Sequence, residues 1–184
     1  MVRMADDSLR DAIREAARHA FQAVRSANPH EHFYYFALVT TGDALRPGPS
    51  ACSLEGLERV LARYRAKGSA CGADALRWSE ADSPHHLYGD GHFRDVEALF
   101  LRGGDHRALP EPAYEEEVAR RFLAMEDALG DLDREGFFGA GAERFAIVIN
   151  VVAPGEEDED TIVARAARLN PAESLVQLRH DLGA

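Results

Sequence analysis

The feature that most constrains the fold is the apolar and aromatic run at residues 33–41. Asn28 and Pro29 precede this run, and Gly42 and Asp43 follow it. Aromatic and β-branched side chains pack well on a pleated surface, and a nearly continuous apolar run is typical of a strand that is covered on both faces. We therefore expect a buried central strand at this position.

A second strand is predicted at residues 144–152, which are mostly apolar and β-branched. We expect it to lie beside the first strand. Elsewhere, apolar residues recur every three or four positions, which is the spacing of helices that bury one face. These helical segments lie near residues 6–28, 53–68, 93–103, 112–136, 160–169 and 171–182. The predicted fold class is α+β, a small central sheet with strands near 33–41 and 144–152 and helices packed against it.

Other segments carry weaker signals. Residues 45–52 contain Pro47 and Pro49, which cannot donate to a ladder, so this segment is expected to be an edge strand or a loop. Residues 75–79 are compatible with a short strand, and residues 80–92 have the composition of turns that cross the surface. Asn170 is expected to cap the last helix.

The composition indicates an ordinary globular protein. A chain of 184 residues, 46 % hydrophobic and 29 % charged, is long enough for one sizeable core. No apolar run approaches the ~20 residues that cross a bilayer, and the first ten residues lack the apolar centre of a signal peptide. We expect one domain over residues 1–184, located in the cytoplasm and without a membrane partner.

The charge balance bears on the kind of partner. The chain has 21 basic and 32 acidic residues, a formal charge of −11, and Lys67 is its only lysine. Nucleic-acid surfaces need clustered basic residues, so we expect no nucleic-acid partner. An acidic surface does attract basic proteins, because complementary fields raise association rates.

Several segments together resemble the bacterial DUF4303 family. They are residues 33–38 with 41–43, 49–51, 76–79, and 133–139 ahead of an apolar strand. The resemblance spans most of the chain and implies a single-domain bacterial protein. It implies no catalytic residues, because the family is uncharacterised. Small acidic α+β proteins of this kind are often compared with the immunity proteins of bacterial toxin systems. This comparison is an analogy based on the class of protein.

Histidines and cysteines are the first candidates for chemistry. His85, His86 and His92 form the densest set of possible metal ligands, but they lack the spacing of known zinc motifs, so a polar surface loop is the preferred interpretation. Cys52 and Cys71 lie in no recognisable catalytic motif, and we expect both to be small buried thiols. No cofactor motif is found, because the glycines at 139–141 precede a strand instead of following one.

Two acidic groups remain as candidates. Asp133 and Glu135 could divide acid and base roles in a small hydrolase. The preferred interpretation of residues 133–139 is structural: a glycine ends the helix, and two phenylalanines attach the turn to the core. The unbroken acidic run is expected to form a solvated cap at a helix start, and it is also the predicted surface for a basic partner. Its members are Glu156, Glu157, Asp158, Glu159 and Asp160.

These observations lead to a main hypothesis and two alternatives. The main one is an acidic protein-binding module, such as a toxin-neutralising immunity protein, that acts on a basic protein. The first alternative is a hydrolase that uses the carboxylate pair or the histidine cluster. The second is a structural or regulatory homo-oligomer, which would expose a large apolar patch.

Overall fold

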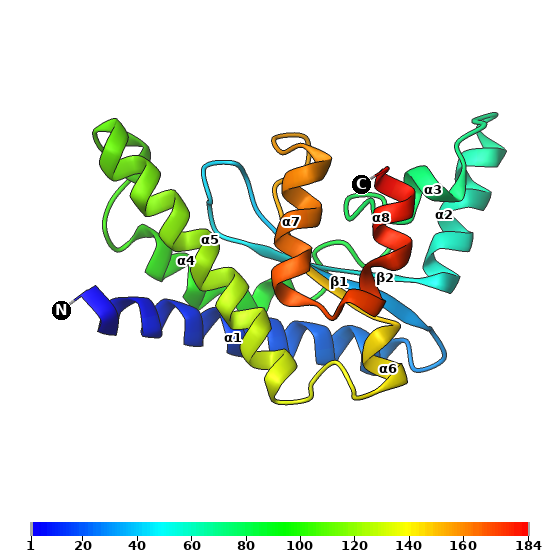
Figure 1. Cartoon of the computed structure of the whole chain (residues 1–184), viewed down its shortest axis with the longest axis horizontal. Coiled ribbons are helices and arrows are strands. Elements are labelled where there is room, and N and C mark those ends of the chain that lie inside the picture. Colours follow the sequence, from blue (N-terminus) through cyan, green and yellow to red (C-terminus); the bar gives the residue numbers. More distant parts are fainter. Residues whose placement is uncertain (1, 184) are drawn as a thin grey trace.

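The computed structural model describes residues 2–183, with the side chains of residues 7–183. Figure 1 shows a small sheet at the centre with helices on both of its faces. The elements in chain order are α1 (Val2–Ala27), β1 (Phe33–Val39), β2 (Gly48–Ser53), α2 (Leu54–Ala66), α3 (Ala73–Leu76), η1 (Asp90–Phe93), α4 (Arg94–Leu101), η2 (His106–Ala108), α5 (Glu111–Arg134), α6 (Ala142–Phe145), β3 (Val148–Val152), α7 (Glu159–Leu169), η3 (Ala172–Leu175) and α8 (Val176–Leu182).

Within the described residues, the sheet has the order β2-β1-β3. β1 pairs antiparallel with β2 and parallel with β3, so that Phe36 lies opposite both Ala51 and Ile149. β1 is therefore the central strand, and Tyr35 to Leu38 are at most 1 % exposed. The α+β class, the buried central strand and its neighbour are confirmed. Residues 45–52 contribute an edge strand, one of the two outcomes expected.

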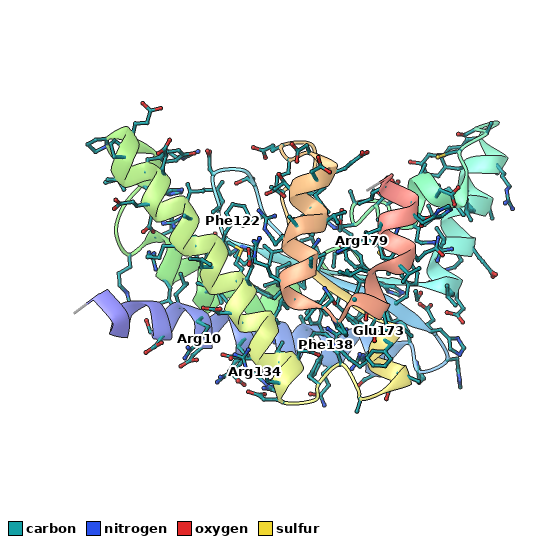
Figure 2. The ribbon with its side chains drawn as sticks, viewed as in Figure 1. Arg10, Phe122, Arg134, Phe138, Glu173 and Arg179 are labelled. Atoms are coloured by element: carbon teal, nitrogen blue, oxygen red, sulfur yellow. The ribbon has the colours of Figure 1, made fainter. Side chains whose placement is uncertain are left out.

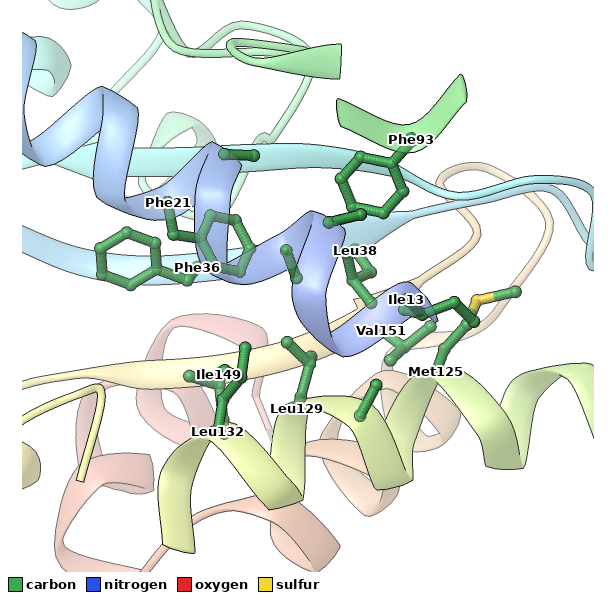
Figure 3. Close-up of a cluster of buried hydrophobic side chains, with 14 of the residues drawn as sticks. Ile13, Phe21, Phe36, Leu38, Phe93, Met125, Leu129, Leu132, Ile149 and Val151 are labelled. Carbon is green, nitrogen blue, oxygen red and sulfur yellow. The ribbon is translucent and has the colours of Figure 1, made fainter. Parts of the chain in front are cut away.

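Each face of the sheet has its own core. On one face, Phe36, Leu38 and Ile149 pack against α1, α4 and α5 (Figure 3). On the other face, Tyr35 and Val148 pack against α7 and α8. Alternate residues of β1 thus enter different cores, which explains why the run is apolar at nearly every position.

The end of α5 follows the preferred interpretation of residues 133–139. Gly136 has a φ of 76°, and its N–H donates to the Asp133 carbonyl while the N–H of Phe137 donates to Leu132. This is a Schellman motif, and glycine suits it because the left-handed conformation is strained for other residues. Phe138 is fully buried and packs on Phe36, with ring centroids 5.5 Å apart.

The outer edge of β3 is closed by side chains. The Asn170 side chain bonds both backbone groups of Ile149, at 2.8 Å to the N–H and 2.7 Å to the carbonyl. The Val151 carbonyl accepts from Arg165 at 2.8 Å, and the Ala153 N–H donates to Glu157 at 3.0 Å. Polar side chains therefore take the hydrogen bonds that a further strand would make.

The outer edge of β2 is covered in a similar way. The Leu87 N–H donates to the Pro49 carbonyl at 2.8 Å, and the Ser83 hydroxyl donates to the Ala51 carbonyl at 2.5 Å. This arrangement explains why the strand predicted at 75–79 is wrong. Those residues instead contain the end of α3 and a turn, because the loop that follows them occupies the free edge of β2.

Two predicted boundaries also need correction. The strand predicted from residue 144 begins at Val148, because residues 142–145 form the short helix α6, where Arg144 is held by Asp133. Asn170 does not cap the last helix, because its side chain is engaged with β3. Pro171 takes the cap position ahead of the 3-10 turn η3.

Candidate functional site

The carboxylates Asp133 and Glu135 are held in two separate ion pairs. Asp133 binds Arg144, which is 6 % exposed and also donates to the Ile147 carbonyl at 2.6 Å. Glu135 binds Arg18 on α1, and this hydrogen bond lowers the pKa of its carboxyl group. Since the two groups have different partners and no shared substrate position, the structure does not assemble the catalytic pair of the hydrolase alternative.

The three candidate histidines also go to separate surroundings. His85 is buried, with its Nε2 atom 2.6 Å from a Glu31 oxygen and its ring against Phe33. His92 lies against His19, with ring centroids 5.5 Å apart. Among the residues that the structure describes, no group of three or more His, Cys, Asp or Glu side chains could hold a metal ion. The structure therefore does not bring His85, His86 and His92 together as one ligand set, and the surface-loop interpretation is incomplete because His85 is buried.

Cys52 and Glu80 are buried on the side of β2 and β1 that faces α7 and α8. Burial raises the pKa of the Cys52 thiol to about 12, so it carries almost no thiolate at neutral pH. Burial also raises the pKa of Glu80, whose carboxyl group accepts a hydrogen bond from the Tyr35 hydroxyl at 3.0 Å. A thiol in this state is a buried structural group, as expected for Cys52.

The raised pKa of Glu80 predicts a specific pH dependence. Between the ordinary pKa and the raised one, the folded state holds a proton that the unfolded state has released, so this group's contribution to stability falls as pH rises. We expect Glu80→Gln to be more stable than the wild type at pH 7, with a difference that shrinks on acidification. Urea unfolding of both proteins from pH 4 to 8 measures it. A difference that stays constant over this range would contradict the prediction.

The acidic run at 156–160 divides into structural and exposed members. Glu157 is nearly buried and binds Arg165 at 2.6 and 2.8 Å, in addition to its bond to β3. Asp158 caps α7 by accepting from the Thr161 N–H at 2.8 Å. Glu156, Glu159 and Asp160 are exposed. The predicted helix cap is confirmed for Asp158, whereas Glu157 is an internal ion-pair residue.

Arg165 connects this run to α5. Besides Glu157, it pairs with Glu126 at 3.3 Å, and its guanidinium lies 4.4 Å from the ring centroid of Phe122. Figure 2 shows Phe122 between α5 and α7. The start of α7 is thus fixed to the sheet and to α5 by one buried arginine.

The exposed acids face the edge of the sheet where β1 and β3 end. Because these two strands are parallel, their carboxyl ends meet at one edge, and Figure 1 shows the starts of α5 and α7 on the same side. At this edge the Tyr114 hydroxyl donates to Asp43 at 2.5 Å. His106 bonds the Asp43 carbonyl at 2.6 Å and stacks on the Tyr114 ring. We call this region the carboxyl edge.

Two neighbouring hollows open at the carboxyl edge and share Arg107. The first measures about 370 Å³ and is lined by Asp43, Leu109, Glu111 and Tyr114. The second measures about 420 Å³ and contains Arg46 and Arg121 among its lining residues. These are volumes found in small-molecule and side-chain binding sites.

The charges of the two hollows differ. In the second hollow, Arg46 pairs with Asp90 and Arg121 with Glu117, so the arginines carry little surplus charge. Arg107, which both hollows share, is paired with Asp105 at 2.9 Å. The first hollow holds Asp43 and Glu111, for which no ion pair within 4 Å is found among the described residues, and this suits a cationic group.

Sequence reasoning missed the residues of the first hollow. A signal was present for Asp43, because it directly follows a buried strand, and the carboxyl ends of parallel strands are common ligand positions. No comparable signal exists for Tyr114 or Glu111, which lie in α5. Tyr114 is 71 residues further along the chain than Asp43. Their meeting depends on how α5 packs.

Comparison with known proteins finds a matching family. A family model described as a domain of unknown function, DUF4303, matches residues 13–171. No curated protein and no solved structure matches the chain. None of the described helices has the length and apolar character needed to cross a membrane. The family model covers most of the sequence, and the chain therefore belongs to the DUF4303 family.

Proposed function

We propose that this protein is a cytoplasmic, bacterial protein-binding module that receives a basic protein at the carboxyl edge, in the role of a toxin-neutralising immunity protein. The observation that carries the proposal is the first hollow, where Asp43 and Glu111 flank the Tyr114 ring and the apolar Leu109. A lysine or arginine side chain has a cationic end and an apolar stem, and both find partners in such a hollow.

The exposed acids of the edge extend this surface. Glu156 lies close to the hollow, because a Cβ atom on Gly42 would stand 2.7 Å from one of its carboxylate oxygens. Glu159 and Asp160 follow at the exposed start of α7. Together with the formal charge of −11, these acids would steer a basic partner toward the hollow before contact.

The hydrolase alternative has weaker support. Its carboxylates Asp133 and Glu135 are divided between two arginines, and its histidines do not converge. The buried Cys52 thiol has a strongly raised pKa. No observation on the described residues favours a hydrolytic site over the binding surface.

The proposal predicts a charge-dependent interaction at one face. Neutralising Glu111, Glu156 and Glu159 together, as glutamines, is expected to weaken binding of the basic partner about tenfold, because rim charges each contribute modestly to affinity and association. The measurement is co-purification of the tagged full chain with proteins of its host at moderate and high salt, followed by mass spectrometry and titration of the captured protein.

A matched variant controls for net charge. Glu58→Gln, Asp74→Asn and Asp127→Asn remove three exposed acids from α2, α3 and α5 away from the carboxyl edge. This variant is expected to bind the partner almost as well as the wild type. Equal losses in both triple variants would mean that only net charge matters, and the edge would then not be the binding surface.

A further inference from the structure

A third hollow lies at the opposite edge of the sheet, where β1 and β3 begin. It measures about 390 Å³ and is lined by residues from the end of α1, the segment before β1, and α6 with the residues that follow it. The lining residues that matter here are Arg25, Asn28, Phe33, Glu143 and Ile147. No part of the carboxyl edge contributes to it, so its function is independent of the function proposed above.

The Arg25 guanidinium lines this hollow and has N–H groups for which no acceptor is found among the described residues. Its Nη1 atom donates to the Phe137 carbonyl at 2.8 Å, and no ion pair with a carboxylate is found for it among the described residues. The guanidinium lies 4.6 Å from the Phe36 centroid and 5.1 Å from that of Phe137. Because aromatic rings cover the faces of the guanidinium, its N–H edge is the part left to bind an acceptor, and a carboxylate matches that edge with two bonds.

Glu143 provides the opposite charge. It is exposed, its side chain has no hydrogen bond or ion pair among the described residues, and its carboxylate acts on Arg25 through space. Its position is set by Gly139, because a Cβ atom there would lie 2.7 Å from the Glu143 carboxyl carbon. Gly139 has a φ of 93°, so both its backbone and its lack of a side chain leave room for Glu143.

The rest of the wall combines an apolar surface with polar groups, of which Glu31 is held by Arg59 and His85, and His32 by Glu55. Phe33 and Ile147 line the hollow, and the Asn28 amide nitrogen donates to the Val24 carbonyl at 2.8 Å, which leaves its side-chain oxygen available. The hollow therefore presents a cation, an anion and an apolar wall to the same ligand. A pocket with a few convergent polar groups on apolar walls is the common form of a small-molecule site.

We propose that this hollow binds a small zwitterion of the α-amino acid class with an apolar side chain. The ligand carboxylate binds the N–H edge of Arg25, its ammonium binds Glu143, and its side chain packs on Phe33 and Ile147. The three groups of the ligand correspond to three features of the wall, whereas a simple carboxylate or a simple amine would use only part of them.

The test measures thermal shifts and calorimetric titrations of the full chain with the twenty standard L-amino acids. Apolar members such as leucine are expected to bind at up to millimolar concentrations. Two analogues of leucine separate the contributions of its charges: 4-methylpentanoate lacks the ammonium, and 3-methylbutylamine lacks the carboxylate. Each is expected to bind about tenfold or more weakly, because each loses a charge-assisted hydrogen bond.

Variants locate the binding in the hollow. Glu143→Gln changes an exposed side chain and is expected to weaken amino-acid binding about tenfold without loss of folding. Arg25→Lys keeps the charge but cannot bind a carboxylate through two parallel N–H groups, and a similar weakening of amino-acid binding is expected. Glu58→Gln, on α2, serves as the unaffected control.

Three results would overturn the proposal. They are an absence of binding for every amino acid at millimolar concentration, equal affinity for leucine and 4-methylpentanoate, or unchanged binding in Glu143→Gln. The triple variant at the carboxyl edge changes no residue of this hollow. Loss of the basic partner in that variant and loss of amino-acid binding in Glu143→Gln or Arg25→Lys are therefore distinguishable results.

Discussion

Replacement of Arg165 by methionine is expected to lower the free energy of unfolding by about 3–5 kcal/mol. Arg165 is 7 % exposed, and its side chain binds Glu157 and the Val151 carbonyl while also pairing with Glu126. Methionine fills much of the volume but leaves two nearly buried carboxylates and a backbone carbonyl without this partner, and uncompensated buried charge is costly. Urea unfolding followed by circular dichroism measures the change.

Arg168 gives a matched control on the same helix. It binds Glu126 at 2.7 and 2.9 Å, but more than half of its side chain is exposed. Arg168→Met is expected to cost about 1 kcal/mol, because Glu126 keeps its ion pair with Arg165 at 3.3 Å and water can enter where the exposed Arg168 guanidinium was. Equal destabilisation by the two substitutions would contradict the role given to Arg165.

The second large effect is expected from Phe36→Ala, at about 3–5 kcal/mol. Phe36 is fully buried at the centre of an aromatic group, 5.0 Å from the Phe21 centroid and 5.5 Å from those of Phe33 and Phe138. Alanine would leave a cavity between the central strand, α1 and the turn after α5. Phe36→Leu keeps most of the volume and is expected to cost about 1.5 kcal/mol or less.

An exposed phenylalanine provides the comparison for this experiment. Phe145 in α6 is 44 % exposed, and Phe145→Ala is expected to change stability by no more than about 0.5 kcal/mol. Thermal or urea unfolding of the three variants ranks them. If Phe36→Ala and Phe145→Ala had similar effects, the core would not be organised around β1.

The fold was largely predictable because burial on both faces leaves a mark in the composition of a strand. Residues 33–39 and 148–152 are apolar at nearly every position, and the parallel pair they form is the centre of the sheet. Helix spacing located the long helices for the same reason. The boundaries at 144 and 170 were wrong because Arg144 and Asn170 bond to groups far away in sequence, which no local pattern records.

The candidate sites were less predictable. A dense run of charged residues, such as 156–160, is easy to find in the sequence. The run does not reveal which of its carboxylates form ion pairs inside the protein. Glu157 forms an internal ion pair with Arg165, whereas Asp43 and Glu111 line the same hollow only because α5 packs beside the end of β1. Arg25 and Glu143 are 118 positions apart and are joined only by the placement of α6 beside α1.

The closed edges of the sheet limit how any partner can be recognised. Asn170, Arg165 and Glu157 occupy the backbone groups of β3, and residues 83–87 occupy groups of β2. A partner strand therefore cannot extend this sheet by pairing with it, and an unfolded chain finds no template there for aggregation. Recognition must read side chains presented by helices and loops, so affinity for a partner should depend on that partner's residue identities and not merely on its ability to adopt an extended backbone.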